Sequence, residues 1–455
     1  MDPERDTVAA VATPPGRGGI GIVRITGPRS REVLRAVVPS LPDPIPERRV
    51  FTAWARDVRT GERLDRVIAF VFDPSSSYTA EEAAEIQGHG GPLVLDRILS
   101  AALAAGAVPA PPGEFTRRAF LGGRMDLVQA EAVAELVAAG ADRAASASVL
   151  QLAGGLSREL DAARAPLVEA LSLLEASLDF ADEAIPDADP TAILRLVEGS
   201  RSRLGRLLAT WEGSRRIFQG VRVALAGPPN TGKSSLFNRL LGRDRAIVDA
   251  EPGTTRDFIE ARASILGIRL TLVDTAGIRP GGGRIETLGM ELALDAVRSA
   301  DVVLLVVDAS GVRPEPLRAL VDAAPGVRMV AAVNKIDLPD RIDAASLSLL
   351  SSLRTFEVSA LTGAGVADLA RHLALGEGAL ADLEGPMLSC TRHRDLVSQA
   401  LSDLDRARDA ISRSLPAEIV SAEIREAISR LDCLTGREAV PEVLDAIFSH
   451  FCVGK

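Results

Sequence analysis

The feature of this sequence that most constrains the fold is a glycine-rich loop between an apolar strand and a helix. Residues 221–226 (VRVALA) read as a buried strand, and a helical stretch (LFNRLLG) follows the loop. The loop at 227–235, GPPNTGKSS, matches G-x-x-x-x-G-K-[ST] in the setting that this pattern requires. The alternative is a glycine-rich turn with a chance lysine, which average residue usage gives in roughly a per cent or two of chains this long. The pattern therefore predicts a phosphate-binding loop.

Each residue type in this loop suits a bound polyphosphate. Backbone N–H groups of the glycine-rich turn surround the phosphates, Lys233 reaches the outer phosphates, and Ser234 is a ligand for Mg²⁺. The loop residues that we expect to contact GTP are Asn230, Thr231, Gly232, Lys233, Ser234 and Ser235.

Short apolar strands alternate with helical stretches through this part of the chain, which is typical of a parallel sheet covered by helices. We expect strands at 221–226, 269–274, 302–308, 328–334 and 355–360. Three polar motifs stand where three of the strands end: DTAG, NKID and SAL. Because ligands bind at the carboxyl ends of strands in open α/β sheets, these motifs should meet around one ligand.

The motifs together predict a guanine nucleotide. Asp337 can accept hydrogen bonds from two guanine N–H groups that adenine does not offer, and Lys335 can cover the base. The N–H of Ala360 suits the guanine oxygen, and Asp274 faces Mg²⁺. A PGTTR motif at 252–256 supplies a switch threonine for Mg²⁺. The residues expected to bind GTP through the three strand-end motifs are Asp274, Thr275, Ala276, Gly277, Asn334, Lys335, Asp337, Ser359, Ala360 and Leu361.

The residue after DTAG is Ile278, where Ras-type proteins have a glutamine that orients the attacking water. An isoleucine cannot do this, so either hydrolysis is very slow or another group positions the water. The glycine-rich stretch downstream carries one carboxylate, Glu286. From residue chemistry alone, Glu286 is better interpreted as a solvated helix residue.

The chain divides into regions with three kinds of sequence pattern. The first part is strand-rich, with helices expected at Glu81–Ile86 and Leu93–Ala105, and both faces of the strand around Val67–Phe72 are expected to be buried. Helical periodicity follows, and it returns after the nucleotide-type region. We expect an α+β domain at 1–120, a helical domain in two parts at 121–217 and 376–455, and an inserted α/β P-loop domain of Ras-like type at 218–375.

Composition limits the function. The net charge of −10 argues against binding a polyanion through global charge, although it leaves room for a local basic surface. Aromatic residues are only 3%, so the sequence points to no stacking platform. Three cysteines argue against a disulfide framework and favour a reducing cytoplasm. No signal peptide or membrane span is expected.

With these pieces in place the chain resembles the MnmE (TrmE) family of tRNA-modifying GTPases over essentially its whole length. The resemblance rests on ATPPGRGGIGIVRITG, EIQGHGGP, PGEFTRRAFLGGRMDLVQAEAV, GPPNTGKSSLFN, PGTTRD, DTAGIR and the final FCVGK. It implies a homodimer that works with the flavoprotein MnmG (GidA) in a heterotetramer-type complex. It also implies that a carboxymethylaminomethyl or aminomethyl group is added to carbon 5 of the tRNA wobble uridine. The one-carbon unit would come from 5-formyl- or methylene-tetrahydrofolate.

The resemblance also implies roles for individual residues. Glu286 matches the family's water-orienting glutamate, which reverses the interpretation from residue chemistry. The GTPase domains of the family dimerise across K⁺, for which the matching ligands are Asn230, Asp249, Glu251 and Thr254. Ser234 and Thr255 match the Mg²⁺ ligands, and Asp249, Thr254 and Thr255 are also expected to bind GTP. The matching folate contacts, in the N-terminal domain and at the chain's end, are Arg24, Glu85, Arg124 and Lys455.

Two positions need separate comment. Arg124 stands where lysine is common in the family; it keeps the charge but changes the contact geometry. Cys452, in FCVGK, matches the family's C-terminal cysteine and is expected to be catalytic beside the folate's one-carbon unit, although its position alone favours a cysteine of no consequence. A regulatory GTPase switch in ribosome assembly is the alternative function. The N-terminal segment and the final FCVGK favour tRNA modification.

Overall fold

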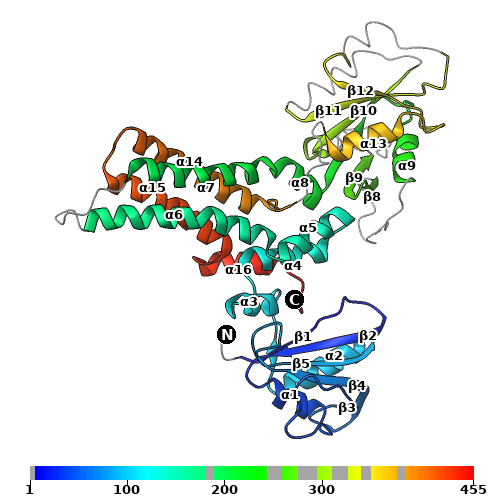
Figure 1. Ribbon diagram of the computed structural model, residues 1–455. Helices are drawn as coiled ribbons and strands as arrows, with labels where there is room; N and C mark the ends of the chain where they lie inside the picture. The colour runs from blue at the N-terminus through cyan, green and yellow to red at the C-terminus, as the bar shows by residue number, and fades with distance from the viewer. Residues whose placement is uncertain are drawn as a thin grey trace. The chain divides into compact units, whose positions relative to one another are not determined.

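The computed structural model describes residues 6–179, 189–242, 259–274, 295–309, 326–339, 350–376 and 385–455 (Figure 1). The chain forms two compact units. The first contains Met1–Val137, Gln151–Leu204 and Asp395–Lys455, and the second contains Ala138–Leu150 and Gly205–Arg394. No helix in the described parts of the chain is long and apolar enough to cross a membrane. The domain boundaries expected from the sequence remain predictions.

The N-terminal part of the first unit is a six-stranded sheet with helices on one face. Its strands are β1 (Val8–Val11), β2 (Gly18–Thr26), β3 (Phe51–Arg56), β4 (Arg63–Phe72), β5 (Ala83–Gly90) and β6 (Val108–Pro109). They lie in the order β3-β4-β5-β2-β1-β6. The helices α1 (Ser30–Val37) and α2 (Pro92–Ala104) supply apolar side chains to the core beneath the sheet, in which Val33, Leu34 and Ile98 are fully buried.

Two expectations for this sheet are wrong. Residues 81–86 were expected to be helical, but from Ala83 onwards they belong to the central strand β5, which pairs with β4 and β2. Pairing on both sides outweighs the helix propensity of its alanines and glutamates. The strand β4 is buried on one face only: Val67, Ala69 and Val71 lie in the core, whereas Ile68 is 39% exposed. Because α1 and α2 cover only the inner face, the outer face stays partly open.

The remaining elements of the first unit are mainly helical. They are α3 (Glu114–Leu121), α4 (Leu127–Ala138), α6 (Gly155–Asp179), α7 (Pro190–Ala209), α14 (Thr391–Ser412), α15 (Ala417–Thr435) and α16 (Pro441–Ser449), of which α4, α7 and α14 each have residues in the second unit. The helices α6 and α15, far apart in sequence, lie side by side (Figure 1). The Nε and an Nη of Arg164 on α6 donate to both carboxylate oxygens of Asp432 on α15, at 2.6 and 2.7 Å.

The second unit contains the sheet that the glycine-rich loop predicted. Its strands are β7 (Val221–Ala226), β8 (Ile259–Ile265), β9 (Ile268–Asp274), β10 (Val302–Asp308), β11 (Arg328–Asn334) and β12 (Arg354–Glu357), in the order β12-β11-β10-β7-β9-β8. Its helices include α5 (Asp142–Leu152, to residue 150), α8 (Trp211–Gln219), α9 (Lys233–Leu241) and α13 (Val366–Leu375). Five strands are parallel, so their carboxyl ends lie along one edge.

The prediction from the sequence omitted one strand and made another too long. β8 was not expected; it pairs antiparallel with β9 at the edge of the sheet, and a short turn at Leu266–Gly267 joins the two. β12 ends at Glu357, three residues before the expected end at 360. This shorter strand leaves Ser359 and Ala360 in a loop, where their polar groups are free to face the site.

We predict that the Arg164–Asp432 pair stabilises the first unit. Asp432→Ala leaves the guanidinium, whose side chain is only 28% exposed, without its acceptor, and should lower the free energy of unfolding by about 2 kcal/mol. The matched control is Arg425→Ala, which breaks the more exposed ion pair with Glu175 between the same two helices and should cost about 0–1 kcal/mol. Urea unfolding followed by helical circular dichroism measures both, and equal losses would contradict the prediction.

Candidate functional site

The glycine-rich loop connects β7 to α9 through backbone conformations that favour glycine. Gly227 has φ +145°, and a Cβ there would lie 2.2 Å from the carbonyl oxygen of Val306. Gly232 has φ +87° and caps α9, and a Cβ there would lie 2.3 Å from Nδ2 of Asn334. Both glycines therefore allow the loop to lie close to neighbouring strands, with the first turn of α9 leading out of it.

Lys233 lies at the first position of α9 and is buried. Its Nζ donates to the carbonyl oxygens of Gly227 and Pro228, at 2.9 and 2.8 Å. The ammonium group therefore binds back to the first two residues of the loop. Burial lowers the pKa of Lys233, and Asp274 partly opposes this shift. Burial thus disfavours the charged form, and negatively charged phosphate oxygens would be stronger partners for it than the two carbonyls.

Ser234 and Asp274 meet at the carboxyl end of the sheet. The hydroxyl of Ser234 donates to Oδ2 of Asp274 at 2.9 Å, and Asp274 is only 2% exposed. A hydroxyl oxygen and a carboxylate oxygen are ligands that Mg²⁺ accepts beside phosphates. The two groups therefore fit a Mg²⁺ ion at the outer phosphates, and the role of Ser234 as a ligand stays a prediction.

Asn334 fastens the phosphate loop to the loop after β12. Its Nδ2 donates to the carbonyl oxygen of Thr231, and its Oδ1 accepts from the N–H of Ala360, each at 2.9 Å. The side chain is buried, at 1% exposure. The sequence predicted Asn334 as a GTP contact, whereas in the structure its amide joins two loops from different strands.

The groups expected at the base lie close to one another. The Nζ of Lys335 donates to the carbonyl oxygen of Asn230 at 2.8 Å and pairs with Asp308 at 2.5 Å. The hydroxyl of the buried Ser359 donates to Oδ1 of Asp337, also at 2.5 Å, and so orients the exposed carboxylate. Leu361 is 77% exposed.

Sequence reasoning missed two residues here. Asp308 holds Lys335 from the end of β10, and Arg239 on α9 donates through Nε to the carbonyl oxygen of Ala360 at 2.9 Å. Asp308 left a signal, because an acidic residue ends an otherwise apolar strand; Arg239 left none. Ser235, also predicted to contact GTP, follows Ser234 on α9 and is exposed. The remaining predicted nucleotide, ion and water-orienting residues lie outside the described residues: Asp249, Glu251, Thr254, Thr255, Thr275, Ala276, Gly277 and Glu286.

A second candidate site lies on the outer face of the N-terminal sheet. Arg24 and Glu85 pair at 3.0 Å across β2 and β5, and both line a pocket of about 370 Å³. Phe115 borders the pocket, with its ring 5.6 Å from the guanidinium of Arg24. Ser77 lines it too, buried at 5% exposure, and its hydroxyl has no hydrogen-bond partner in the described structure. The pocket thus offers a cation, an anion and an unpaired hydroxyl.

The C-terminal residues lie against this site. Backbone N–H groups of Gly113 and Phe115, at the start of α3, donate to the carbonyl oxygens of Cys452 (3.4 Å) and Lys455 (3.2 Å). An Nη of Arg24 donates to the carbonyl oxygen of Gly454 at 3.3 Å. These three contacts hold the end of the chain in place.

Gly454 permits this close approach. It has φ +87°, and a Cβ there would lie 2.5 Å from the carbonyl oxygen of Val11. The exposed Cys452 and the half-buried Lys455 line a second pocket of about 870 Å³, with residues 11–16 of the first strand and loop. The tail therefore touches both pockets, because Arg24 contacts it from the first and Cys452 lines the second.

The structure brings together three of the four predicted folate contacts. Arg24 and Glu85 share the smaller pocket, and Lys455 adjoins it through the tail. Arg124 does not line either pocket in the described structure; its guanidinium donates to the carbonyl oxygen of Pro74 at 2.5 Å. Pro74 precedes Ser76 and Ser77, so Arg124 supports a loop that borders the smaller pocket.

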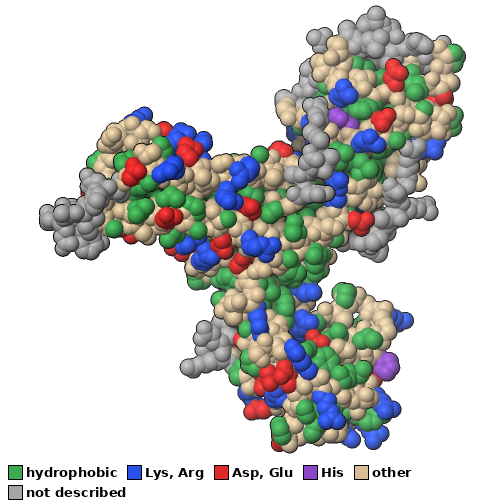
Figure 2. All heavy atoms as spheres, viewed as in Figure 1, with side chains coloured by type: hydrophobic (Ala, Val, Ile, Leu, Met, Phe, Trp, Pro, Cys, Tyr) green, Lys and Arg blue, Asp and Glu red, His purple; other side chains and the backbone are tan. Residues whose placement is uncertain are grey.

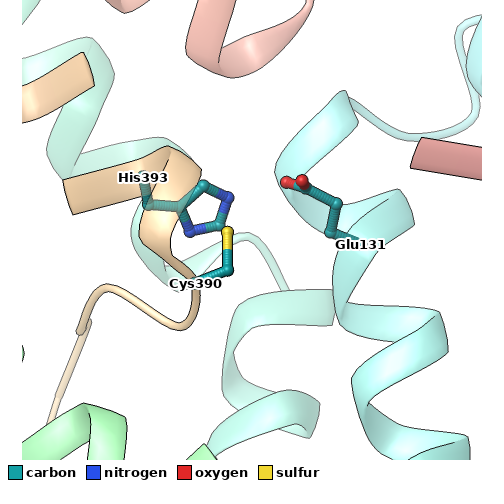
Figure 3. A group of neighbouring side chains, drawn as sticks. All are labelled: Glu131, Cys390 and His393. Atoms are coloured by element: carbon teal, nitrogen blue, oxygen red, sulfur yellow. The ribbon is translucent and has the colours of Figure 1, made fainter. Parts of the chain in front are cut away.

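The other two cysteines lie elsewhere and are half-buried. Cys390 precedes α14, and His393 lies in the first turn of that helix (Figure 3). His393 is fully buried, with Nδ1 3.3 Å from the hydroxyl of Ser389. Glu131, also drawn in Figure 3, belongs to the other unit. Cys452 is thus the exposed thiol of the three.

Comparison with known proteins matches the chain over its full length. A model of the MnmE helical domain matches residues 127–452, and a model of the GTP-binding protein TrmE N-terminus matches residues 7–124. Proteins named tRNA modification GTPase MnmE from Geobacter sulfurreducens and Koribacter versatilis are each 39% identical over 454 residues, covering 99% of both chains. The protein of that name from Roseiflexus castenholzii is 41% identical over 468 residues, again covering 99% of both chains. With a phosphate-binding loop in its second unit and full-length similarity to these relatives, the chain belongs to the MnmE family of tRNA modification GTPases.

Proposed function

We propose that the protein hydrolyses GTP and modifies tRNA together with a flavoprotein partner, MnmG (GidA). The product is a carboxymethylaminomethyl or aminomethyl group on carbon 5 of the wobble uridine, with a tetrahydrofolate as one-carbon donor. The protein acts as a homodimer in the cytoplasm. The observation that carries this proposal is the contact between the tail bearing Cys452 and the pocket of Arg24 and Glu85, in a chain that also has a nucleotide site. A GTPase that serves only as a switch has no evident use for that contact.

The nucleotide site supports GTP binding through its own side chains. Lys233 would exchange its two carbonyl partners for the outer phosphates, and Asn334 would keep the phosphate loop and the Ala360 loop in register. Asp337, oriented by Ser359, would accept the guanine N–H groups. Bound Mg²⁺, held by Ser234 and Thr255, would offset phosphate charge as hydrolysis proceeds.

The N-terminal pocket supports a folate in a similar way. Glu85 would accept N–H groups of the pteridine ring, while arginine or lysine would pair with the carboxylates of the folate's tail. Ser77 adds a buried hydroxyl that lacks a partner in the described structure, and Phe115 adds an aromatic wall. The donor and acceptor groups of the pocket therefore fit such a ligand. A bound folate would supply the one-carbon unit.

The test of the proposed function is nucleoside analysis of tRNA from a strain that lacks this gene. The modified wobble uridine should be absent and should return when the intact gene is restored. Unchanged modification in the deletion strain would rule out the proposed function. Loss of ribosomal subunits with normal tRNA modification would favour the regulatory alternative.

Guanine specificity is predicted to depend on Asp337. Asp337→Asn replaces an acceptor with a donor, so GTP affinity should fall by about 2–4 kcal/mol. Xanthosine triphosphate should become the preferred ligand, because its carbonyl replaces the guanine amino group. Titration with fluorescent analogues of the two nucleotides measures the change. Wild-type GTP affinity in this variant would show that Asp337 does not read the base.

GTP turnover is predicted to require K⁺ and to rise with protein concentration. Ile278 cannot orient water. A monovalent cation can stabilise the negative charge that develops on the phosphates in the transition state, as an arginine side chain does in other GTPases. Turnover should therefore be faster in K⁺ than in Na⁺, and equal rates would contradict the K⁺ site.

Glu286→Ala should lower kcat and leave nucleotide affinity nearly unchanged. A loss of affinity alone would make Glu286 a structural residue.

Cys452 is predicted to be essential for tRNA modification but not for GTP hydrolysis. Cys452→Ser changes an exposed thiol that lines the larger pocket, and it should abolish the modified uridine while folding and GTP turnover stay at wild-type levels. Cys390→Ser and Cys433→Ser are the matched controls, and each should leave modification intact. Normal wobble-uridine modification in the Cys452→Ser strain would show that the thiol is dispensable.

A further inference from the structure

The outer face of the N-terminal sheet carries an exposed tryptophan at its β3 edge. Trp54 on β3 is 42% exposed, although it lies in a chain with few aromatic residues. Arg66 on β4 is its direct cross-strand partner. The guanidinium of Arg63 lies over the indole, with its Cζ 5.0 Å from the ring centroid. An exposed indole with arginines beside it is the combination on which single-stranded nucleic acids stack.

Five arginines on and near β3 and β4 form no ion pair within the part of the chain that the structure describes. The side chains that form no ion pair with any described acidic residue are Arg49, Arg56, Arg59, Arg63 and Arg66. Figure 2 shows Arg side chains around the β3 and β4 end of the sheet. Positive charge is therefore concentrated here, although the chain as a whole is acidic.

The nearby carboxylates are engaged with other groups. Glu62 pairs with Arg97 at 2.8 Å, and Asp65 contacts His89 at 2.8 Å. Asp57 accepts from the backbone N–H groups of Thr60 and Arg59, and these hydrogen bonds, with the nearby charge of Arg59, lower its pKa. Because the Debye length is about 8 Å at physiological salt, distant acidic residues are largely screened from this surface. The charges of Arg63 and Arg66 are thus available to an anion.

The same face of the sheet leads from Trp54 to the pocket of Arg24 and Glu85. Arg66, Ile68 and Phe70 alternate along this face of β4, and Phe70 pairs with Glu85, which pairs with Arg24. From strand spacing and rise the path is roughly 20 Å long. A loop of RNA on this face would therefore extend to the candidate folate pocket.

We propose that this face, defined by Trp54, Arg63 and Arg66, binds the single-stranded loop that carries the target uridine. A base stacks on Trp54, and the arginines bind the phosphates beside it. The inference rests on the proposed function, because it takes tRNA as the substrate. Charge complementarity favours RNA over a second copy of this acidic chain as the occupant.

Binding of the full-length protein to an unmodified tRNA transcript, and to its isolated anticodon stem–loop, tests the inference across a range of salt concentrations. Trp54→Ala should weaken binding about five- to hundredfold, and Trp54→Phe should restore part of it. Arg63→Ala/Arg66→Ala should reduce the slope of log affinity against log salt by about 1.4, because each single-strand phosphate contact contributes about 0.7. GTP turnover should be unchanged in all three variants.

The matched control is Arg29→Ala/Arg35→Ala, which removes the same charge beside α1 on the opposite face of the sheet and should leave both affinity and slope near wild type. Equal losses in the control, or wild-type binding by the Trp54 and arginine variants, would overturn the inference. Dissociation of the dimer in sedimentation, with unchanged RNA affinity, would instead assign the face to a second copy. If the wild-type protein bound no tRNA, the inference would be wrong. The proposed function has its own test, which is nucleoside analysis of the deletion strain.

Discussion

The packing of α16 against α4 decides where the end of the chain lies. Leu444, Phe448 and Phe451 are buried in one cluster with Leu127 and neighbouring apolar residues of α4. Burial of three large side chains of this kind contributes several kcal/mol, enough to hold a segment that would otherwise fray. The backbone of Phe448 also approaches Gly113 so closely that a Cβ there would lie 2.6 Å from the Phe448 carbonyl oxygen. The hydrogen bonds from the start of α3 to the tail follow from this packing.

The nucleotide site depends on a different constraint, the common direction of five strands. Because those strands are parallel, the phosphate loop, Asp274, Asn334 and the loop after β12 all meet at one edge. The side-chain amide of Asn334 then fixes two of these loops relative to each other, because it hydrogen-bonds to both the phosphate loop and the loop after β12. This site and the tail site lie in different units.

Local charge matters more than net charge in this protein. The acidic total disfavours non-specific binding of nucleic acid, yet Arg63 and Arg66, which form no ion pair with a described acidic residue, lie beside Trp54. The sequence had pointed to no stacking platform, because 3% aromatic residues is a low total. One exposed tryptophan can suffice when strand pairing sets arginines beside it, and cross-strand register cannot be read from composition.

The sequence by itself determined what depends on residues close together in the chain. The strand–loop–helix at 221–241, the helical periodicity and the strand at Val302–Asp308 were all predictable, because each pattern is local. Only the tertiary structure decided what depends on residues far apart. It made Ala83–Gly90 a strand through its two neighbours, gave Asn334 its bracing contacts, left one face of β4 open, and brought Gly454 to Arg24 across 430 positions. Such contacts depend on the packing of whole elements, which no local stretch of sequence encodes.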